Sequence, residues 1–184
     1  MDKKVKILGI SGSLRKQSCN RGLLQAALEE APSNCSLEIF NLDGIPLYNQ
    51  DEETNLPESV INLKQKVSTA DAILIATPEY NYSMPGVLKN ALDWGSRPYG
   101  DNAWNNKPVA IMGASPAMQG TSRAQYHLRQ VFVYLNMHAL NQPEIMVGSL
   151  QDSFDSKGAL IDPKTRKKIS ELLIALIDHV NRYS

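Results

Sequence analysis

The sequence has few of the residues from which metal centres, disulfide frameworks and nucleophile–base pairs are built. Its 184 residues include two cysteines and three histidines. Cys19 and Cys35 do not form a CxxC pair, and His127, His138 and His179 lack a metal-ligand spacing such as HExxH. We therefore expect two free thiols, no metal site, and no catalytic cysteine or histidine.

Net charge and long apolar runs are also lacking. Lys plus Arg and Asp plus Glu number 19 each, and a protein without net charge is poorly suited to nucleic acid or to anionic membranes. The sequence contains no run of about 18 apolar residues, so no membrane span is predicted. The apolar stretch near the N-terminus is too short for a secretory signal. We expect a cytoplasmic protein with a single domain, 1–184, that binds neither nucleic acid nor membrane.

Two glycine-rich phosphate motifs are missing. The Walker A pattern GxxxxGK[ST] does not occur, and Gly9 and Gly12 have the wrong spacing for the dinucleotide fingerprint GxGxxG. A nucleotide phosphate, if the chain binds one, is therefore held by a different kind of loop.

Apolar runs typical of buried strands alternate with segments of helical periodicity. Strands are predicted at 4–10, 36–42, 71–78, 109–115 and 144–150. Helices are predicted at 20–30, 57–70, 84–94, 121–140 and 163–180. This alternation indicates an α/β fold, with a five-stranded parallel sheet between two helical layers. In such folds, ligands bind beyond the carboxyl ends of the strands.

The loop after the first predicted strand reads GISGSLRKQSCN, residues 9–20, and is rich in hydrogen-bond donors. Ser11, Ser13, Ser18 and Asn20 can donate through their side chains, and the N-terminus of the following helix favours an anion. Arg15 can add a charge-assisted bond. This combination suits a phosphate monoester. The alternative is that Ser18 or Asn20 serves only as a helix cap.

The loops after the third and fourth predicted strands face the same crevice. The first, TPEYNYSMPG, offers backbone amides for the edge of a flat heterocycle, and Tyr80 or Tyr82 could cover its face. The second, GASPAMQGTSRAQ, offers Ser115 and the amides up to Gly120, and donors there would stabilise the negative charge of a reduced flavin. Each loop, taken alone, is also compatible with a plain connection.

Together these motifs resemble the NADPH-dependent FMN reductase family. The similarity runs from Val5 to about Gly148, and it is carried by GSLRKQSCN, PEYNYSMPGVLKNALDW and GASPAMQGTSRAQYHLRQ in that order. The resemblance implies a flavodoxin-like three-layer fold with strand order 2-1-3-4-5, and assembly into homodimers or homotetramers. Pro116–Gln119 replaces a turn that is often richer in glycine in the family.

The resemblance also implies which residues hold the cofactor FMN. Those of the first loop would bind its phosphate: Ser13, Arg15, Ser18 and Asn20, with Ser11 and Cys19 counted in the same loop. Those of the second and third loops would surround its ring: Pro78, Glu79, Tyr80 and Asn81, with Ser115 and Gly120 on the far side.

The implied reaction is ping-pong. Hydride passes from NAD(P)H to N5 of FMN, and the electrons then reduce a quinone, azo compound, free flavin or metal oxyanion such as chromate. The flavin supplies the chemistry, so no catalytic side chain is required. Tyr82 and Met84 would line an open substrate site. Trp94, Tyr99 and Trp104 are candidates for contact with a second subunit, although Trp94 could equally belong to the core.

Two other functions stay open from the sequence. A flavodoxin-type electron carrier would bind FMN without using NAD(P)H, but carriers are typically acidic and the isoelectric point here is near 6.8. A nicotinamide-binding dehydrogenase could use Asp43 to bind a ribose hydroxyl. Asp43 lies 31 residues after Gly12, however, where such folds place this residue about 20 residues along.

Overall fold

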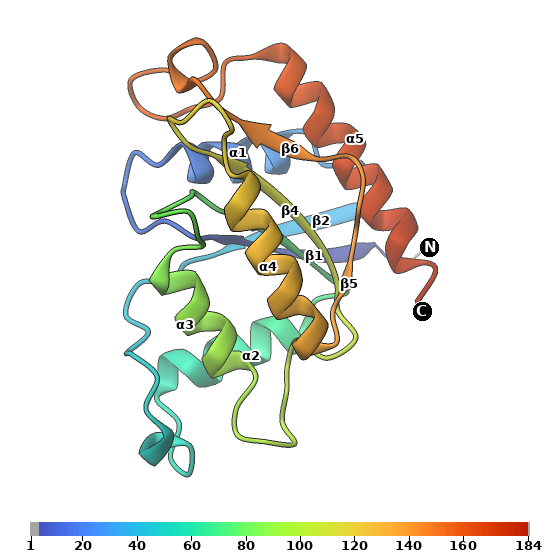
Figure 1. Cartoon of the computed structure of the whole chain (residues 1–184). Coiled ribbons are helices and arrows are strands. Elements are labelled where there is room, and N and C mark those ends of the chain that lie inside the picture. The colour runs from blue at the N-terminus through green and yellow to red at the C-terminus, as the bar shows by residue number, and fades with distance from the viewer. Residues whose placement is uncertain (1–3, 184) are drawn as a thin grey trace.

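The computed structural model describes residues 4–183, which form a parallel sheet with helices on both faces (Figure 1). The strands are β1 Val5–Ser11, β2 Cys35–Phe40, β3 Ala72–Ala76, β4 Pro108–Ala114, β5 His138–Ala139 and β6 Ile145–Val147. The α-helices are α1 Cys19–Glu29, α2 Glu58–Thr69, α3 Gly86–Gly95, α4 Ser122–Leu135 and α5 Pro163–Val180. Two short 3-10 helices are η1 Gln50–Glu52 and η2 Leu150–Asp152.

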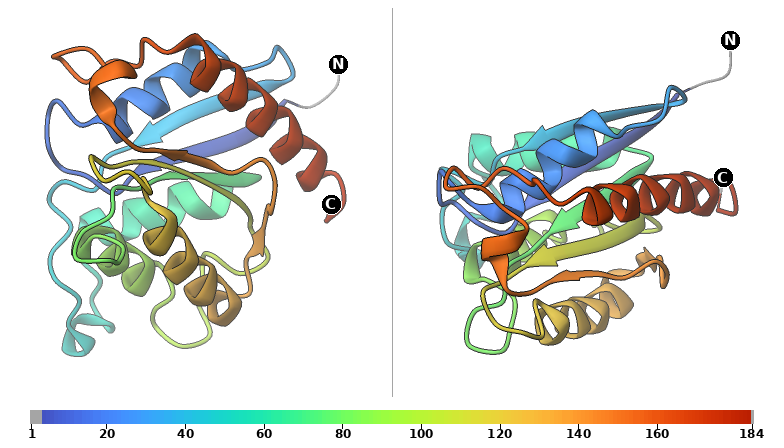
Figure 2. Two further views of the ribbon diagram at one scale, coloured as in Figure 1. Left: turned by 45° about the horizontal axis from the view of Figure 1, so that its top comes forward. Right: turned by 90° about the horizontal axis from the view of Figure 1, so that it is seen from above.

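The sheet has the order β2-β1-β3-β4-β5, which confirms the flavodoxin-like prediction. All of its strand pairs are parallel. The register places Ser11 of β1 beside Ala76 of β3, and Ala76 beside Met112 of β4. The carboxyl ends of β1 and β3 are therefore level, and β4 continues two residues further, to Ala114. The loops that follow the three strands emerge together at one end of the sheet (Figure 2, left).

The fifth predicted strand, 144–150, is wrong in its extent. Two short strands pair with successive parts of β4 instead, with Val109 beside Ala139 in β5 and Met112 beside Ile145 in β6. Pro143 lies between them and lacks the backbone N–H that a continuous ladder would need. The sheet consequently has six strands rather than five.

The predicted helix 121–140 is too long at its C-terminal end. Helix α4 ends at Leu135 because Asn136 adopts the left-handed conformation, with φ 56°. Asparagine tolerates this conformation better than most residues, and its backbone N–H bonds to the carbonyls of Phe132 and Val133. The chain then turns back along the sheet into β5.

Helices α1 and α5 pack on one face of the sheet, and α2, α3 and α4 on the other (Figure 2, left). Every residue of β3 and β4 is buried, as expected for central strands covered on both faces. Each buried Ile, Leu or Val contributes about 1.5–3 kcal/mol through the hydrophobic effect. Among residues 4–183, no helix is long and apolar enough to cross a membrane.

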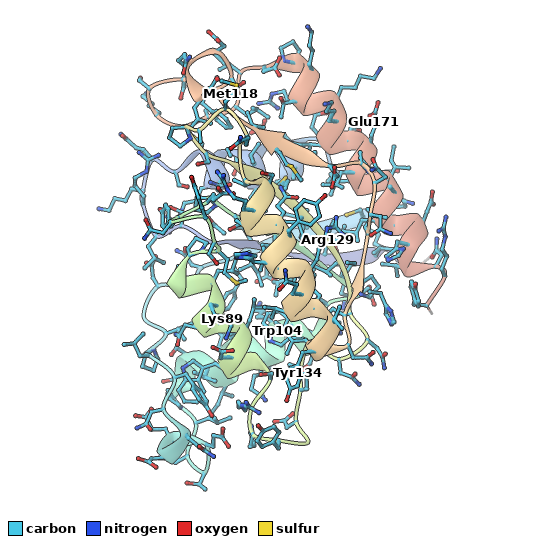
Figure 3. The ribbon with its side chains drawn as sticks, viewed as in Figure 1. Lys89, Trp104, Met118, Arg129, Tyr134 and Glu171 are labelled. Carbon is cyan, nitrogen blue, oxygen red and sulfur yellow. The ribbon has the colours of Figure 1, made fainter. Side chains whose placement is uncertain are left out.

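Trp94 and Trp104 belong to the core of the protomer, so their prediction as subunit contacts is wrong. They are 0% and 1% exposed, and each indole N–H donates to a backbone carbonyl, of Pro46 and Leu92 respectively. Figure 3 shows Trp104 between α3 and α4. Tyr99, in contrast, is 72% exposed, with its ring against the Arg97 guanidinium.

Candidate functional site

The loop after β1 folds back on itself through its serine hydroxyls. Ser11 Oγ accepts a hydrogen bond from the Ser13 backbone N–H at 3.3 Å, and Ser13 Oγ accepts one from the Arg15 N–H at 3.3 Å. The Gly12 N–H donates to the Ala76 carbonyl at 2.8 Å, which fastens the loop to the end of β3. Ser11 and Ser13 are buried, whereas the Arg15 side chain is exposed.

Ser18 is the N-cap of α1. Its backbone is extended and its hydroxyl accepts a hydrogen bond from the Asn20 N–H at 3.2 Å. The capping role considered for Ser18 in the sequence is thus present, and it leaves the hydroxyl proton free to donate. Helix α1 has no acidic residue in its first turn that would compete for its positive end.

Asn20 joins the first loop to the third. Its Nδ2 donates to the Ala114 carbonyl at 2.9 Å, and its Oδ1 accepts from the Ala114 N–H at 3.0 Å. This two-bond contact is buried and ties the start of α1 to the end of β4. Asn20 therefore shapes the site through the backbone of Ala114, in addition to any contact with a ligand.

Cys19 is not an activated thiol, although it is the first residue of α1. It is buried, and burial raises the pKa of its thiol, although the nearby Arg15 partly opposes this shift. A thiol with a raised pKa stays protonated near neutral pH and is a poor nucleophile.

The loop after β3 ends in a tight two-residue turn. Tyr80 and Ser83 exchange backbone hydrogen bonds of 2.9 Å in both directions. The residues between them, Asn81 and Tyr82, have φ of 49° and 65°. Two successive positive φ values define a type I′ turn, which is unusual for tyrosine. The turn projects Tyr80 and Tyr82 outward, and they are 52% and 67% exposed.

Glu79 connects this loop to α4. Its carboxylate accepts from the backbone N–H groups of Arg123 and Ala124, at 2.9 and 3.1 Å, and from Arg123 Nε at 2.7 Å. Helix α4 has no side-chain cap of its own at Thr121, so Glu79 caps it from a distant part of the chain. Burial would raise the pKa of Glu79, but the bonds from Arg123 and Ala124 prevail and lower it.

Two further contacts hold the turn against α4. The Arg123 guanidinium lies 3.8 Å from the centre of the Tyr82 ring, and His127 Nδ1 lies 2.9 Å from Ser83 Oγ. We call Glu79, Arg123, Tyr82, His127 and Ser83 the α4 clamp. The motif PEYN predicted Glu79 and its neighbours as lining residues, but nothing in the sequence singled out this pairing with Arg123.

The loop after β4 is held against β6. The Ser115 N–H donates to the Val147 carbonyl at 3.0 Å, and Gly120 has φ 58°. Between them, Pro116–Gln119 are exposed, and Met118 is 91% exposed at the outside of the loop (Figure 3). The structure thus places all the predicted site residues at one end of the sheet, on the three loops and the start of α1.

Comparison with known proteins agrees with this arrangement. The family model described as NADPH-dependent FMN reductase matches residues 5–152. The chain belongs to this family. It is 50% identical, over 96% of its length and 95% of the relative's, to a Pseudomonas aeruginosa protein named NAD(P)H-dependent FMN reductase. It is 44% identical to a 2-hydroxy-1,4-benzoquinone reductase of a Burkholderia species, with 92% of each chain covered.

A solved structure supports the same relationship. The flavoenzyme FerB of Paracoccus denitrificans, an NAD(P)H:(acceptor) oxidoreductase, superposes with a TM-score of 0.88 at 34% identity. The alignment covers 97% of this chain and 98% of FerB. The FMN reductase family membership therefore rests on both sequence and fold.

The donor set at the first loop fits the phosphate of FMN. The buried hydroxyls of Ser13 and Ser18, the first turn of α1 and the exposed guanidinium of Arg15 are hydrogen-bond donors, and all belong to one loop and the helix start that follows it. A phosphate monoester accepts such bonds on three oxygens, and helix N-termini favour negative charge. Gly12 adds to the fit, because an added Cβ would lie 3.3 Å from Leu88, Pro78 and Thr77.

Proposed function

We propose that the chain binds FMN across the three loops and uses NAD(P)H to reduce quinones. The observation that carries this proposal is the convergence of the three loops at the neighbouring carboxyl ends of β1, β3 and β4. The phosphate would be held by Ser11, Ser13, Arg15, Ser18, Cys19 and Asn20. The ring would lie against Pro78, Glu79, Tyr80 and Asn81, with Ser115 and Gly120 on its other side.

When bound, FMN supplies hydride acceptance and donation, so the chain's own residues have to bind and orient. The backbone amides of the loop after β3 can donate to the polar edge of the ring. Glu79 is fully engaged in the α4 clamp, and the Cys19 thiol is protonated, so neither acts as a general base. The exposed Tyr80 and Tyr82 leave room beside the site for a flat acceptor.

Quinones are the acceptors best supported by relatives. Besides the Burkholderia reductase, an NAD(P)H:quinone oxidoreductase of Solanum tuberosum is 42% identical over 94% of this chain. Azo compounds, free flavins and metal oxyanions belong to the same proposal, because a flavin passes electrons to many acceptors. An electron carrier is less well supported, since the relatives are named as NAD(P)H-dependent enzymes.

The C-terminal end of α4 and the loop after α3 suit contact with a second copy of the chain. Tyr99 in that loop, and Val133 and Tyr134 on α4, are 72%, 82% and 72% exposed. Figure 3 labels Tyr134 at this end of α4. Large exposed apolar patches often mark interfaces. We therefore propose a homo-oligomer built on this face. Light scattering of the purified protein tests it: the Val133→Glu variant is expected to have a lower mass than the wild type. A cytoplasmic location and a single domain stay predictions from the sequence.

The test of the function is an anaerobic titration of the FMN-loaded protein with NADPH, followed by 1,4-benzoquinone. We expect the yellow flavin absorbance to bleach and then to return. The Arg15→Ala variant should bind FMN about tenfold or more weakly, since a charge-assisted bond is worth about 1.5–3 kcal/mol. Protein that binds FMN but is not bleached by NADPH would support the electron carrier, and protein that binds no FMN would refute the proposal.

A further inference from the structure

A groove of about 400 Å³ runs along the outer face of α1, away from the loops after β3 and β4 that would surround the flavin ring. It begins at Ser11 and Ser18, in the phosphate loop, and extends to Glu29 at the end of the helix. At 1.5 Å per residue, the helix from Ser18 to Glu29 is roughly 16 Å long. The volume lies within the range of about 300–1,000 Å³ that is typical of ligand pockets.

The wall of the groove opposite β2 is the segment 157–160, which is seated directly on α1. A Cβ on Gly22 would lie 1.9 Å from the Gly158 carbonyl oxygen, so only glycine at position 22 allows this approach. Gly158 itself has φ 84°. Arg166 fixes the far end through the Leu160 carbonyl at 3.1 Å and Glu29 at 3.0 Å. The groove is therefore a defined feature of the backbone rather than a gap between side chains.

The lining of the groove suits an adenine nucleotide. Ile39, 39% exposed on β2, and the exposed Ala159 give it apolar sides for a flat base. Gln25 and Asn41 supply side-chain amides, the groups that match the adjacent donor and acceptor of adenine; Gln25 Nε2 already donates to Glu29 Oε1 at 3.2 Å, which leaves its Oε1 to accept. Arg21 is held in place by Asn41 at 2.8 Å.

Two cations in the lining have no counterion. Lys16 and Lys157 are exposed, and neither forms an ion pair with another residue of the range 4–183. By contrast, Arg21 pairs with Asp43 and Arg166 with Glu29 and Glu30. Lys16 and Lys157 lie near the same end of the groove, since Gly158 approaches the backbone of Gln17 and Ser18. Two unpaired lysines beside an apolar slot are the charge pattern expected for a nucleoside with two phosphate groups on its ribose.

We propose that this groove binds the adenosine half of NADPH, with Lys16 at the pyrophosphate and Lys157 at the 2′-phosphate. The assignment rests on the proposed function, which requires a second phosphate-bearing reactant besides FMN. In that coenzyme the adenosine is separated from the nicotinamide by the pyrophosphate. Its subsite must therefore lie at a distance from the flavin ring, and the groove meets this condition because its lining includes no residue of the loops after β3 and β4.

The test measures binding of adenosine 2′,5′-bisphosphate to the FMN-loaded protein by calorimetry. We expect it to bind, and to bind at least about fivefold more weakly to Lys157→Glu, because one charge-assisted bond is lost and repulsion is added. The ratio of kcat/KM for NADPH to that for NADH should fall by a similar factor, mainly through KM. The control is Lys168→Glu, which makes the same charge change on α5 outside the groove and should leave both measurements unchanged.

The results separate this proposal from the proposed function. If NADPH bleaches the flavin normally but adenosine 2′,5′-bisphosphate does not bind, or binds equally to Lys157→Glu, the groove assignment is wrong and the reductase activity stands. If FAD binds more tightly than FMN and Lys157→Glu removes that advantage, the groove holds the AMP half of a flavin dinucleotide, which also overturns the assignment. If NADPH does not bleach wild-type protein, it is the function that fails.

Discussion

Replacement of Glu79 should destabilise the folded protein although the residue lies in a loop. Its side chain is only 5% exposed and accepts three hydrogen bonds, two from the backbone at the start of α4 and one from Arg123. A missing N-cap costs about 0.5–2 kcal/mol, and a bond between charged groups is worth about 1.5–3 kcal/mol. Because Arg123 is 34% exposed and can regain water, we take the lower part of these ranges. Glu79→Ala should lower the free energy of unfolding by about 2–4 kcal/mol.

Urea unfolding followed by tryptophan fluorescence measures this loss. The matched control is Asp93→Asn on α3, which removes an exposed carboxylate paired with Lys89 at 2.6 Å and should cost less than about 1 kcal/mol. Glu79→Gln should fall between the two, since an amide oxygen still accepts from the backbone. FMN should also bind more weakly to Glu79→Ala, because the clamp holds two of the three loops together. If Glu79→Ala cost no more than Asp93→Asn, the clamp would not contribute to stability and this reasoning would be refuted.

The same contact predicts a pH dependence. The folded-state pKa of Glu79 is lowered from about 4.5, so its contribution is complete above that value and is lost as the pH falls through the lower, folded-state pKa. The difference in unfolding free energy between wild type and Glu79→Gln should therefore be constant from pH 6 to 8 and should shrink below about pH 4.5. A difference that grew on acidification would contradict the assigned sign.

Three other substitutions test the packing around the site. Gly22→Ala should destabilise the protein by about 1–3 kcal/mol despite the better helix propensity of alanine, because its Cβ would overlap a backbone oxygen. Gly86→Ala should not destabilise it, because a Cβ there would have no atom within 4 Å. Thermal unfolding of the two variants distinguishes these outcomes. Asn20→Ala should lower the free energy of unfolding in urea by about 2–4 kcal/mol, since the buried N–H and the buried carbonyl of Ala114 each lose the bond to Asn20. A decrease below about 1 kcal/mol would contradict this. Lys64→Met should lower the melting temperature by a few degrees, because the buried amine donates to two carbonyls of the 97–101 loop; an unchanged temperature would exclude that role.

The sheet was largely predictable because its central strands are buried on both faces. Such strands read as continuous apolar runs, and DAILIATP and VAIMGAS are clear examples. The edge beyond β4 was less predictable. There the chain makes only short pairings, and hydrophobic periodicity does not report where a left-handed Asn136 or a proline without an N–H interrupts an element.

The site was predictable to the level of loops. Donor-rich sequence at the carboxyl ends of three parallel strands indicates where a ligand binds, because the fold fixes that those ends are adjacent. Which donors are already occupied depends on partners far along the chain. Asn20 bonds to a residue 94 positions away and Glu79 to residues 44 and 45 positions away. No local pattern encodes such pairings.

The two long-range contacts explain how a site made of loops can hold a defined shape. Loops are usually the mobile parts of a fold, since their backbone groups lack ladder partners. Here Asn20 fixes the first loop to the end of β4, and Glu79 fixes the second loop to the start of α4. The third loop connects the end of β4 to the start of α4, so the two contacts hold its two ends. The polar side chains that look like ligand-binding groups in the sequence thus have a second role, which is to set the spacing of the backbone donors that a flavin would meet.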